Sequence, residues 1–387
     1  MQALELDDIQ SGVLRPRPTP FAAVYVGLRI DDRKAGRALM QRLSDVVSSA
    51  AHPESPAGDT WISAALTFAG LKSLGVPPSS LDTFSPQFQQ GMAARARALG
   101  DVGASDPDRW EKPLGSPDLH VVITGIAPAS ERLEAALERA RDVLHSSPGI
   151  AAIWRQDCHV MPGEREPFGF KDGISHPAVE GSGIPGTNPH ESPLKAGEFV
   201  LGYSNEMSDS TEIPQPDVLG RNGSYVAFRK LYQDVAAFRR YLKVNAASAG
   251  EEELLAAKMM GRWRSGAPLA LSPNADDPAL GEDGARNNVF LFRSDDAIGY
   301  RTPLGSHIRR ANPRDSAIAG LARIHRMIRR GTAYGPPLPD GVLDDDGADR
   351  GLMFAFVGAN LGRQFEFVQT EWANDSAFFA GRSEKDP

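Results

Sequence analysis

Three short segments of this 387-residue chain carry most of the side chains that could do chemistry. They are residues 168–177, 305–314 and 323–335. In the first segment, Gly169 and Gly173 lie on either side of Asp172. Glycine tolerates unusual dihedral angles and the close approach of a planar ligand. An Asp-Gly pair is also a common turn signal, so taken alone this segment is more simply explained as an ordinary turn.

The other two segments are rich in arginine. His307 is followed by three arginines and by the pair Asn312-Pro313. A lone histidine is more often structural than a ligand, but cationic neighbours of this kind would suit a cofactor that carries two carboxylates. Residues 323–335 fit a basic helix end closed by glycine, where the helix dipole favours cations. Neither segment by itself indicates one function.

The elements that must position these segments follow from hydrophobic periodicity. In the first part of the chain we predict strands at residues 21–30, 61–68, 120–125 and 150–155, and helices at residues 34–49, 69–74 and 129–145. Four strands interleaved with two longer helices indicate a split βαβ unit of the ferredoxin-like kind.

The middle of the chain is dense in Gly and Pro, and one strand is predicted there, at residues 198–203. Beyond it we predict strands at residues 224–230 and 351–357, and helices at residues 235–245, 251–263, 316–330 and 365–373. This pattern indicates a second α+β unit. The domain limits predicted from it are 1–160 for a first domain, 161–223 for a connecting region and 224–387 for a second domain.

Composition excludes several classes of protein. Fifty acidic and 42 basic side chains leave a net charge of -8, which disfavours a nucleic-acid partner. Apolar stretches fall short of the roughly 20 residues that cross a bilayer, and residues 1–20 lack the pattern of a signal peptide. We therefore expect a cytoplasmic protein with no membrane partner. The single cysteine, Cys158, excludes an intrachain disulfide and c-type haem attachment, and a buried free thiol is expected.

Taken together, the motifs resemble those of the dye-decolorizing peroxidase family. The resemblance lies in GFxDG at residues 169–173, HIRxxNPR at 307–314, RRGxxYG at 329–335, and RQFEFVQ at 363–369 before Trp372. It implies an α+β fold of the dimeric α+β barrel superfamily type, with two ferredoxin-like domains that enclose haem b.

The resemblance also implies roles for individual residues. His307 matches the proximal ligand of the haem iron, and Glu366 is our candidate acceptor for its other ring nitrogen. Asp172 matches the distal acid and base, and Arg329 matches the distal arginine. The residues expected to contact the haem are Gly173, Ile174, Ser175, His307, Asn312, Pro313, Arg314 and Arg329.

The segment at residues 329–335 departs from the family pattern at one position and contains one candidate for electron transfer. Some family members place an asparagine two residues after the distal arginine, whereas this chain has Gly331, so we expect one polar group fewer in the distal pocket. Tyr334 is our candidate for a surface residue that passes electrons from donors too large to enter the pocket. Simple packing of its ring is the alternative. Trp263 and Trp372 are further candidates for electron transfer.

Two further histidines, His325 and His176, lie close to the motifs in the sequence. His325 is predicted on the same helix as Arg329, so it could face the pocket, although an ordinary packing role is the simpler expectation. His176 follows the Asp172 motif directly and is expected to be a loop residue or a neighbour of a haem propionate.

The resemblance therefore implies a hydrogen-peroxide-dependent haem peroxidase. Hydrogen peroxide and small-molecule or dye electron donors would be its partners. Asp172 would move the proton of the peroxide and Arg329 would stabilise the negative charge. The alternative is a haem carrier, sensor or iron-release protein without peroxidase turnover, and a third possibility is a ferredoxin-like interaction protein.

Overall fold

A computed structural model of the chain describes residues 3–18, 20–51, 60–128, 131, 133–135, 137–138, 148–209, 211–316, 321–374 and 385–386. The chain divides into two compact units. The first comprises Met1–Val160, Lys195–Arg229 and Ala355–Leu361, and the second comprises Met161–Leu194, Lys230–Phe354 and Gly362–Pro387. All three segments singled out by their chemistry lie in the second unit. The domain limits expected from the sequence stay a prediction.

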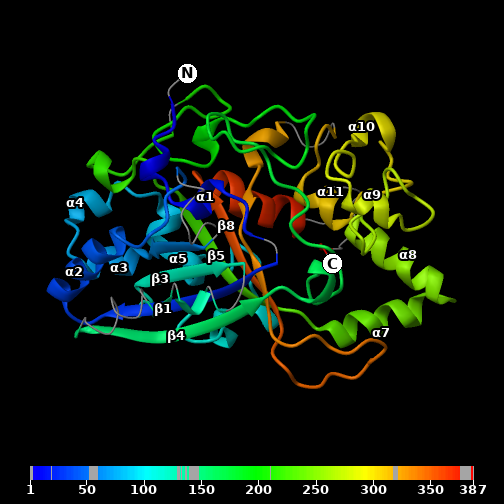
Figure 1. The fold of residues 1–387 in the computed structure, drawn as a ribbon, viewed down its shortest axis with the longest axis horizontal. Helices are drawn as coiled ribbons and strands as arrows, with labels where there is room; N and C mark the ends of the chain where they lie inside the picture. Colours follow the sequence, from blue (N-terminus) through cyan, green and yellow to red (C-terminus); the bar gives the residue numbers. More distant parts are fainter. Residues whose placement is uncertain are drawn as a thin grey trace. The chain divides into compact units, whose positions relative to one another are not determined.

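The first unit is built on a four-stranded antiparallel sheet. Its strands are β1 (Ala22–Ile30), β2 (Trp61–Leu66), β3 (Val121–Ala127) and β4 (Ile150–His159). They are ordered β2-β3-β1-β4, and Figure 1 shows β1, β3 and β4 side by side. The register of β1 on β4 shifts between Gly27 and Leu28, which marks a β-bulge.

Short helices accompany this sheet. They are α1 (Ser11–Leu14), α2 (Arg33–Ser44), α3 (Phe68–Ser73), α4 (Pro78–Leu81) and α5 (Pro86–Arg95). The Asp32 side chain begins α2 by accepting a hydrogen bond from the backbone N–H of Ala35 at 2.7 Å. Leu39 and Leu43 of α2 then pack into the core with Leu28 and Ile123 of the sheet.

A second sheet contains β5 (Tyr225–Tyr232), β8 (Gly351–Gly358) and β6 (Ile328–Arg329), in the order β5-β8-β6. A further strand, β7 (Thr332–Tyr334), pairs antiparallel with β8, and Ala333 lies opposite Leu352. Arg329 therefore belongs to a strand, and this strand sets the direction of its side chain.

The helices of the second unit are α7 (Val235–Asn245), α8 (Ala249–Met260), α9 (Pro278–Glu282), α10 (Phe292–Asp295) and α11 (His307–Ala311). Figure 1 shows α9, α10 and α11 grouped near α8. Two π-helical turns, Gly362–Glu366 and Val368–Ala373, follow β8. The core here is divided among small clusters, such as Phe170 with Leu242 and Ala256, and Phe290 with Phe292 and Ala270.

The loop that follows α8 braces the parts of the second unit that carry chemistry. Gly261 ends α8 in the left-handed conformation, with φ of 92°. A Cβ at this position would lie 2.4 Å from a side-chain carbon of Ile308 in α11. A Cβ on Gly266, with φ of 98°, would lie 2.6 Å from a side-chain carbon of Ile174. The two glycines let one loop approach both the histidine helix and the Asp172 loop.

Most predicted elements are present within a few residues, and the α+β class is confirmed, but two element predictions are wrong. The expected helix at residues 316–330 is a 3₁₀ turn at Ala322–His325 followed by β6. Pairing with β8 overrides the helical pattern there. The expected strand at residues 198–203 is a 3₁₀ turn at Ala196–Glu198 followed by turns, and Gly202 has φ of 91°. The helix expected at residues 129–145 lies mostly outside the described residues.

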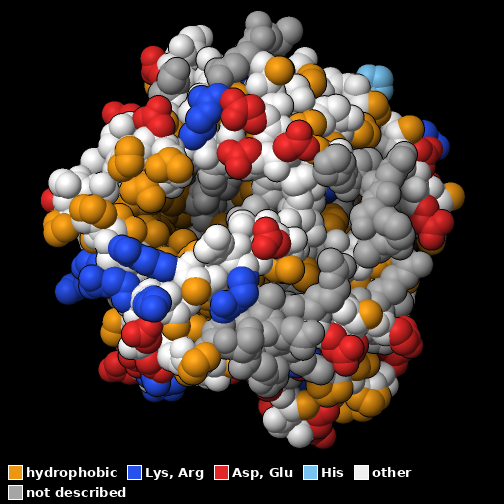
Figure 2. All heavy atoms as spheres, turned by 60° about the vertical axis from the view of Figure 1, so that its left-hand side comes forward, with side chains coloured by type: hydrophobic (Ala, Val, Ile, Leu, Met, Phe, Trp, Pro, Cys, Tyr) orange, Lys and Arg blue, Asp and Glu red, His pale blue; other side chains and the backbone are white. Residues whose placement is uncertain are grey.

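The surface carries charge of both signs. Figure 2 shows acidic and basic side chains interspersed with hydrophobic ones over the described part of the visible face. Within the part of the chain that the structure describes, we find no helix whose length and hydrophobicity would let it cross a membrane.

We predict that Gly261→Ala destabilises the protein. The left-handed backbone alone costs a non-glycine residue about 1–3 kcal/mol, and the added Cβ would overlap Ile308. Chemical denaturation measures the effect. Gly250→Ala is the control, because Gly250 lies in α8 with nothing within 4 Å of an added Cβ, and it should stabilise by up to about 1 kcal/mol. Equal stability of the Gly261→Ala variant and the wild type would contradict the bracing role.

Candidate active site

Asp172 lies at the base of a short hairpin in the second unit. The backbone N–H of Glu166 donates to the carbonyl of Phe170 at 2.9 Å, and the N–H of Asp172 donates to the carbonyl of Glu164 at 3.4 Å. The Asp172 Oδ1 atom accepts a hydrogen bond from the N–H of Gly173 at 2.6 Å. The Asp172 side chain is exposed. The local turn therefore fixes one carboxylate oxygen while the group stays accessible to a reactant.

Arg329 reaches the same loop from β6. Its Nη2 atom donates a hydrogen bond to the carbonyl oxygen of Ser175 at 3.2 Å. Ser175 comes three residues after Asp172, so the structure brings the guanidinium to the loop that carries the carboxylate. An acid–base group and a cation that were expected to act together are thus found in one region.

His307 is the first residue of α11, which follows Ser306. Its Nδ1 atom lies 2.9 Å from Oδ2 of Asp386. Because Asp386 can only accept a hydrogen bond when ionised, Nδ1 carries the proton and Nε2 is left with a lone pair in the neutral ring. The carboxylate therefore fixes the tautomer that a metal ligand needs at Nε2.

Charged groups surround His307, and part of its ring is accessible. The negative charge of Asp386 raises the pKa of His307, and burial of the ring opposes this effect. Arg329 also lowers this pKa and Glu166 raises it, so both lie within electrostatic reach of the imidazole. The ring is not closed off by packing, since 38% of its side-chain surface is accessible. A ligand could therefore reach the imidazole.

A cluster of arginines adjoins this region. Arg262 is 6% exposed and donates to Oδ1 of Asn288 at 2.7 Å. Arg314 donates to the same oxygen at 3.3 Å. Burial, together with the positive charges of Arg314 and Arg329, lowers the pKa of Arg262 to about 9. Burial also lowers the pKa of Arg314 to about 10. The cluster therefore favours an anion beside it.

The segment after α11 aims Arg314 into this cluster. Arg314 has φ of 52°, an unusual value for arginine. Its Nη1 atom donates to the carbonyl oxygens of Asn288 and Phe290 at 2.8 and 2.7 Å, and its guanidinium lies 3.7 Å from the centre of the Phe290 ring. The Asn312 side chain accepts from the N–H of Arg314 at 3.3 Å, and Pro313 is buried. The Asn-Pro-Arg sequence thus shapes the turn that presents the guanidinium.

Asn288 also ties this cluster to the Asp172 loop. Its Nδ2 atom donates to the carbonyl oxygen of Ile174 at 2.9 Å. The carbonyls of Ile174 and Ser175, just after Gly173, are therefore anchored by Asn288 and Arg329. All the residues expected to contact the cofactor belong to the second unit.

Two of our expectations about neighbouring residues need correction. The acceptor for Nδ1 of His307 is Asp386 and not Glu366, which lies half-buried in a π-helical turn. The expected surface position of Tyr334 is wrong, because its side chain is 1% exposed. Its hydroxyl donates to Asp349 at 3.1 Å, and Lys230 lies 4.7 Å from the ring centre.

The other histidines and the cysteine have ordinary surroundings. The Nδ1 atom of His325 lies 2.6 Å from the carbonyl oxygen of Arg363, and its ring stacks on Phe367 with centroids 3.9 Å apart. His325 thus has the packing role expected as the simpler case. His176 lies in a loop, where its N–H donates to Thr187. The Cys158 thiol is buried and is not part of a disulfide, as expected.

The structure also gives a reason for Gly331. A Cβ at this position would lie 2.9 Å from the backbone carbonyl oxygen of Met353. A side chain there would require the neighbouring strand to move. The absence of asparagine at this position therefore matches the close approach of the β6–β7 segment to β8.

Sequence reasoning missed Asp386, Arg262, Asn288 and Glu166. Asp386 lies 79 positions from His307 in the sequence, and no local spacing connects the two. Asn288 lies in a loop-rich stretch without helical or strand periodicity, and Arg262 lies near the end of the helix predicted at residues 251–263, where the local pattern does not mark it as a site residue. A Glu-Pro pair just before a glycine-rich turn was the only local signal for Glu166.

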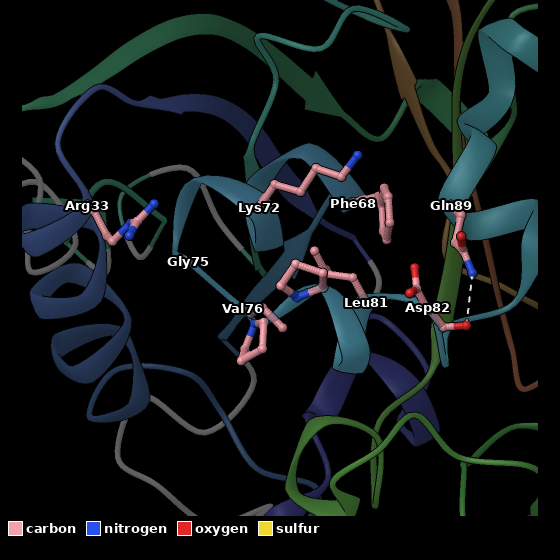
Figure 3. Close-up of a pocket in the computed structure, with 10 residues that line it drawn as sticks. Arg33, Phe68, Lys72, Gly75, Val76, Leu81, Asp82 and Gln89 are labelled. Atoms are coloured by element: carbon pink, nitrogen blue, oxygen red, sulfur yellow. Dashed lines mark hydrogen bonds between the residues drawn. The ribbon is translucent and has the colours of Figure 1, made fainter.

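A separate hollow of about 600 Å³ lies in the first unit. Figure 3 shows that Phe68 and Lys72 of α3, Arg33 of α2 and Leu81 of α4 line it. None of the residues predicted to do chemistry lines this hollow. It is therefore separate from the candidate active site.

No family model matches the chain, but individual proteins do. Peroxidase 2 of Mycetinis scorodonius is 34% identical over 340 residues, which cover 84% of this chain and 64% of that protein. The chain thus spans less than two thirds of that relative. A dye-decolorizing peroxidase of Mycena epipterygia is 32% identical over 98% of this chain and 74% of that protein. A solved dye-decolorizing peroxidase in complex with 2,6-dimethoxyphenol is 30% identical, covers 97% of this chain and 86% of that one, and has a TM-score of 0.85.

We predict that His325 makes the protein sensitive to acid. Burial lowers the pKa of His325, so below the unfolded-state pKa of about 6.5 the unfolded chain binds a proton more readily than the folded protein does. The contribution of His325 to the free energy of unfolding is therefore fully present above that pH and is lost as the pH falls. His325→Asn should cost about 1–3 kcal/mol at neutral pH through lost stacking, and this cost should shrink towards about pH 5.

Denaturation curves across this pH range provide the measurement. His190→Asn is the matched control, because His190 is exposed and should leave the pH profile unchanged. A cost of His325→Asn that stays constant from neutral to acidic pH would show that the ring does not titrate differently in the two states.

Proposed function

Because the chain belongs to the dye-decolorizing peroxidase family, we propose that it is a haem b peroxidase that reduces hydrogen peroxide to water and oxidises phenols, dyes and similar donors one electron at a time. The observation that carries the proposal is the pairing of an accessible imidazole, held by a carboxylate, with neighbouring arginines that favour an anion. Haem presents an iron that binds imidazole and two propionates that bind guanidinium.

The residues present fit this cofactor. His307 would bind the iron through Nε2, since Asp386 holds the other ring nitrogen at 2.9 Å. A carboxylate partner makes the imidazole a stronger donor to iron. Arg314 and the neighbouring Arg262 would stabilise the propionates, and propionate charge would offset the burial and the like charges that together lower the pKa of Arg262 to about 9. Donor type and charge thus agree with haem b.

When bound, haem supplies the redox chemistry that stores two oxidising equivalents. The chain's own residues move the proton. Asp172 would accept a proton from hydrogen peroxide and return it to the departing oxygen, and this acid–base role needs an accessible carboxylate held in a fixed direction. Its Oδ1 contact with the N–H of Gly173 at 2.6 Å provides that direction.

Arg329 would stabilise the negative charge that develops as the peroxide bond breaks. Its hydrogen bond to the carbonyl of Ser175 holds the guanidinium beside the Asp172 loop. Because this position exists before the reactant arrives, little reorganisation is needed during the reaction. Gly331, two residues after Arg329, adds no polar side chain to the pocket, and a side chain there would meet the carbonyl of Met353.

The choice of donor is part of the proposal. A solved relative was crystallised with 2,6-dimethoxyphenol, and we propose phenols of this class for this chain. Donors too large for the pocket would pass electrons through Tyr334. Since the ring is buried, it would act as an internal relay, and Asp349 at 3.1 Å could take the hydroxyl proton as the ring is oxidised.

We predict that Asp172→Asn and Arg329→Leu both slow the reaction with peroxide. Loss of an acid–base group typically costs about 10² to 10⁴ in rate, and loss of a preorganised charge costs about 10² to 10³. Stopped-flow absorption of the haem-loaded variants provides the measurement, with haem content as the control. If either variant reacts at the wild-type rate, its assigned role is wrong. Haem binding without any peroxide reaction in the wild type would favour a carrier or sensor.

A second prediction concerns Tyr334→Phe. Removing the hydroxyl removes the proton donor to Asp349, so turnover of bulky dyes should fall several-fold while peroxide activation and small phenols are spared. Steady-state rates with each donor provide the measurement. Tyr300→Phe is the control, because Tyr300 is 83% exposed. A fall in all three rates would indicate a structural defect, and no change in any of them would place the electron route elsewhere.

A further inference from the structure

The loop that carries Asp172 is held by a hairpin of residues 164–172, here called the Asp172 hairpin. Arg165 and Lys171 form a bridge across it. The N–H of Gly169 closes the tip by donating to the carbonyl oxygen of Glu166 at 2.8 Å. With only one bridge, backbone pairing alone would leave this hairpin weakly held.

Glu166 supplies the missing support from inside the hairpin. Its Oε1 atom accepts from the N–H of Phe170 at 2.9 Å, and its Oε2 atom accepts from the N–H of Phe168 at 3.0 Å. The Oε2 atom also accepts from Nε2 of Gln233, beyond the hairpin, at 2.7 Å. One side chain therefore binds the backbone on both sides of Gly169 and links it to the rest of the unit.

The location of this carboxylate is unfavourable for a charge. Glu166 is 8% exposed, and burial, with a smaller effect of the nearby charge of Asp172, raises its pKa. The three donors that contact it are neutral groups. A glutamate buried in this way is retained at a cost to stability, which points to a role in fixing backbone geometry.

Packing holds the hairpin by a different route. The rings of Phe168 and Phe170 contact Phe238, with centroids 4.8 and 6.3 Å apart. The guanidinium of Arg264 lies 5.1 Å from the centre of the Phe170 ring. These contacts fix the side chains, and the carbonyl of Arg264 accepts from the N–H of Lys171 at 3.1 Å. Glu166 fixes the amides of Phe168 and Phe170 at the tip of the hairpin.

We propose that Glu166 is a positioning residue whose buried carboxylate orders the Asp172 hairpin and thereby aims Asp172 at the peroxide. This inference rests on the proposed function, because it assigns Glu166 an effect through Asp172. A shift of about 1 Å in a reacting group can cost about 10² in rate. Glu166 needs no contact with the reactant to have an effect of this size.

The test compares Glu166→Gln with Gln233→Ala in the haem-loaded protein. Glutamine keeps the size of the side chain but turns one acceptor into a donor that faces a backbone N–H. We expect faster hydrogen exchange at the amides of Phe168 and Phe170, a peroxide reaction slowed roughly 10- to 100-fold, and unchanged haem content. Gln233→Ala removes only the outer hydrogen bond, so both effects should be much smaller.

A double variant separates positioning from independent effects. In the Asp172→Asn background, Glu166→Gln should cause little further loss, because the group that it positions is already disabled. If the rate of the double variant equalled the product of the two separate rate losses, the proposal would be overturned. A wild-type rate for Glu166→Gln alone would also overturn it. A wild-type rate for Asp172→Asn alone would instead refute the proposed acid–base function.

A conservative variant covers the case in which Glu166→Gln does not fold. Glu166→Asp keeps the charge but withdraws both oxygens by one methylene group. A slow peroxide reaction with full haem content would support the proposal. If the amides of Phe168 and Phe170 exchanged rapidly in this variant while the peroxide reaction kept its wild-type rate, the proposal would be overturned. Loss of order in the hairpin would then have no effect on the reaction.

Discussion

The burial of like charges in the second unit is the constraint on which the candidate site depends. Arg262 and Arg314 share one oxygen of Asn288, and burial with mutual repulsion lowers the pKa of Arg262 to about 9. Such an arrangement costs free energy unless an anion lies beside it. The chain retains this arrangement because hydrogen bonds to Asn288 and to backbone carbonyls hold both guanidinium groups in place. A cofactor with two carboxylates turns this unfavourable charge into binding energy.

The same contacts couple the two sides of the site. Asn288 reaches the carbonyl of Ile174 as well as both arginines, and the loop after α8 approaches α11 through Gly261 and the Asp172 loop through Gly266. Asn288 and this loop therefore link the segments that carry His307, Asp172 and the two arginines. This explains how a region with few long elements can hold reacting groups in defined positions.

Sequence reasoning predicted the regular elements better than the connections between them. Strands β1 and β5 and helices α7 and α8 follow simple periodicity, so their residues indicate them directly. Arg329 was expected on a helix and lies on a strand, because pairing with β8 decides its conformation. The motif residues were found through a family resemblance, whereas Asp386 is joined to His307 only by tertiary contact. Burial likewise cannot be read locally, and Tyr334 was expected at the surface for that reason.

The central claim is that this chain binds haem through His307 and uses it to reduce peroxide. Mixing the haem-loaded protein with one equivalent of hydrogen peroxide in a stopped-flow spectrometer tests it most directly. We predict that the ferric spectrum is replaced in one phase by that of a species two electrons more oxidised, and that the observed rate rises linearly with peroxide concentration when peroxide is in excess. Two equivalents of a phenol should then restore the ferric spectrum. An unchanged spectrum, or slow bleaching of the haem with no recovery, would contradict the claim.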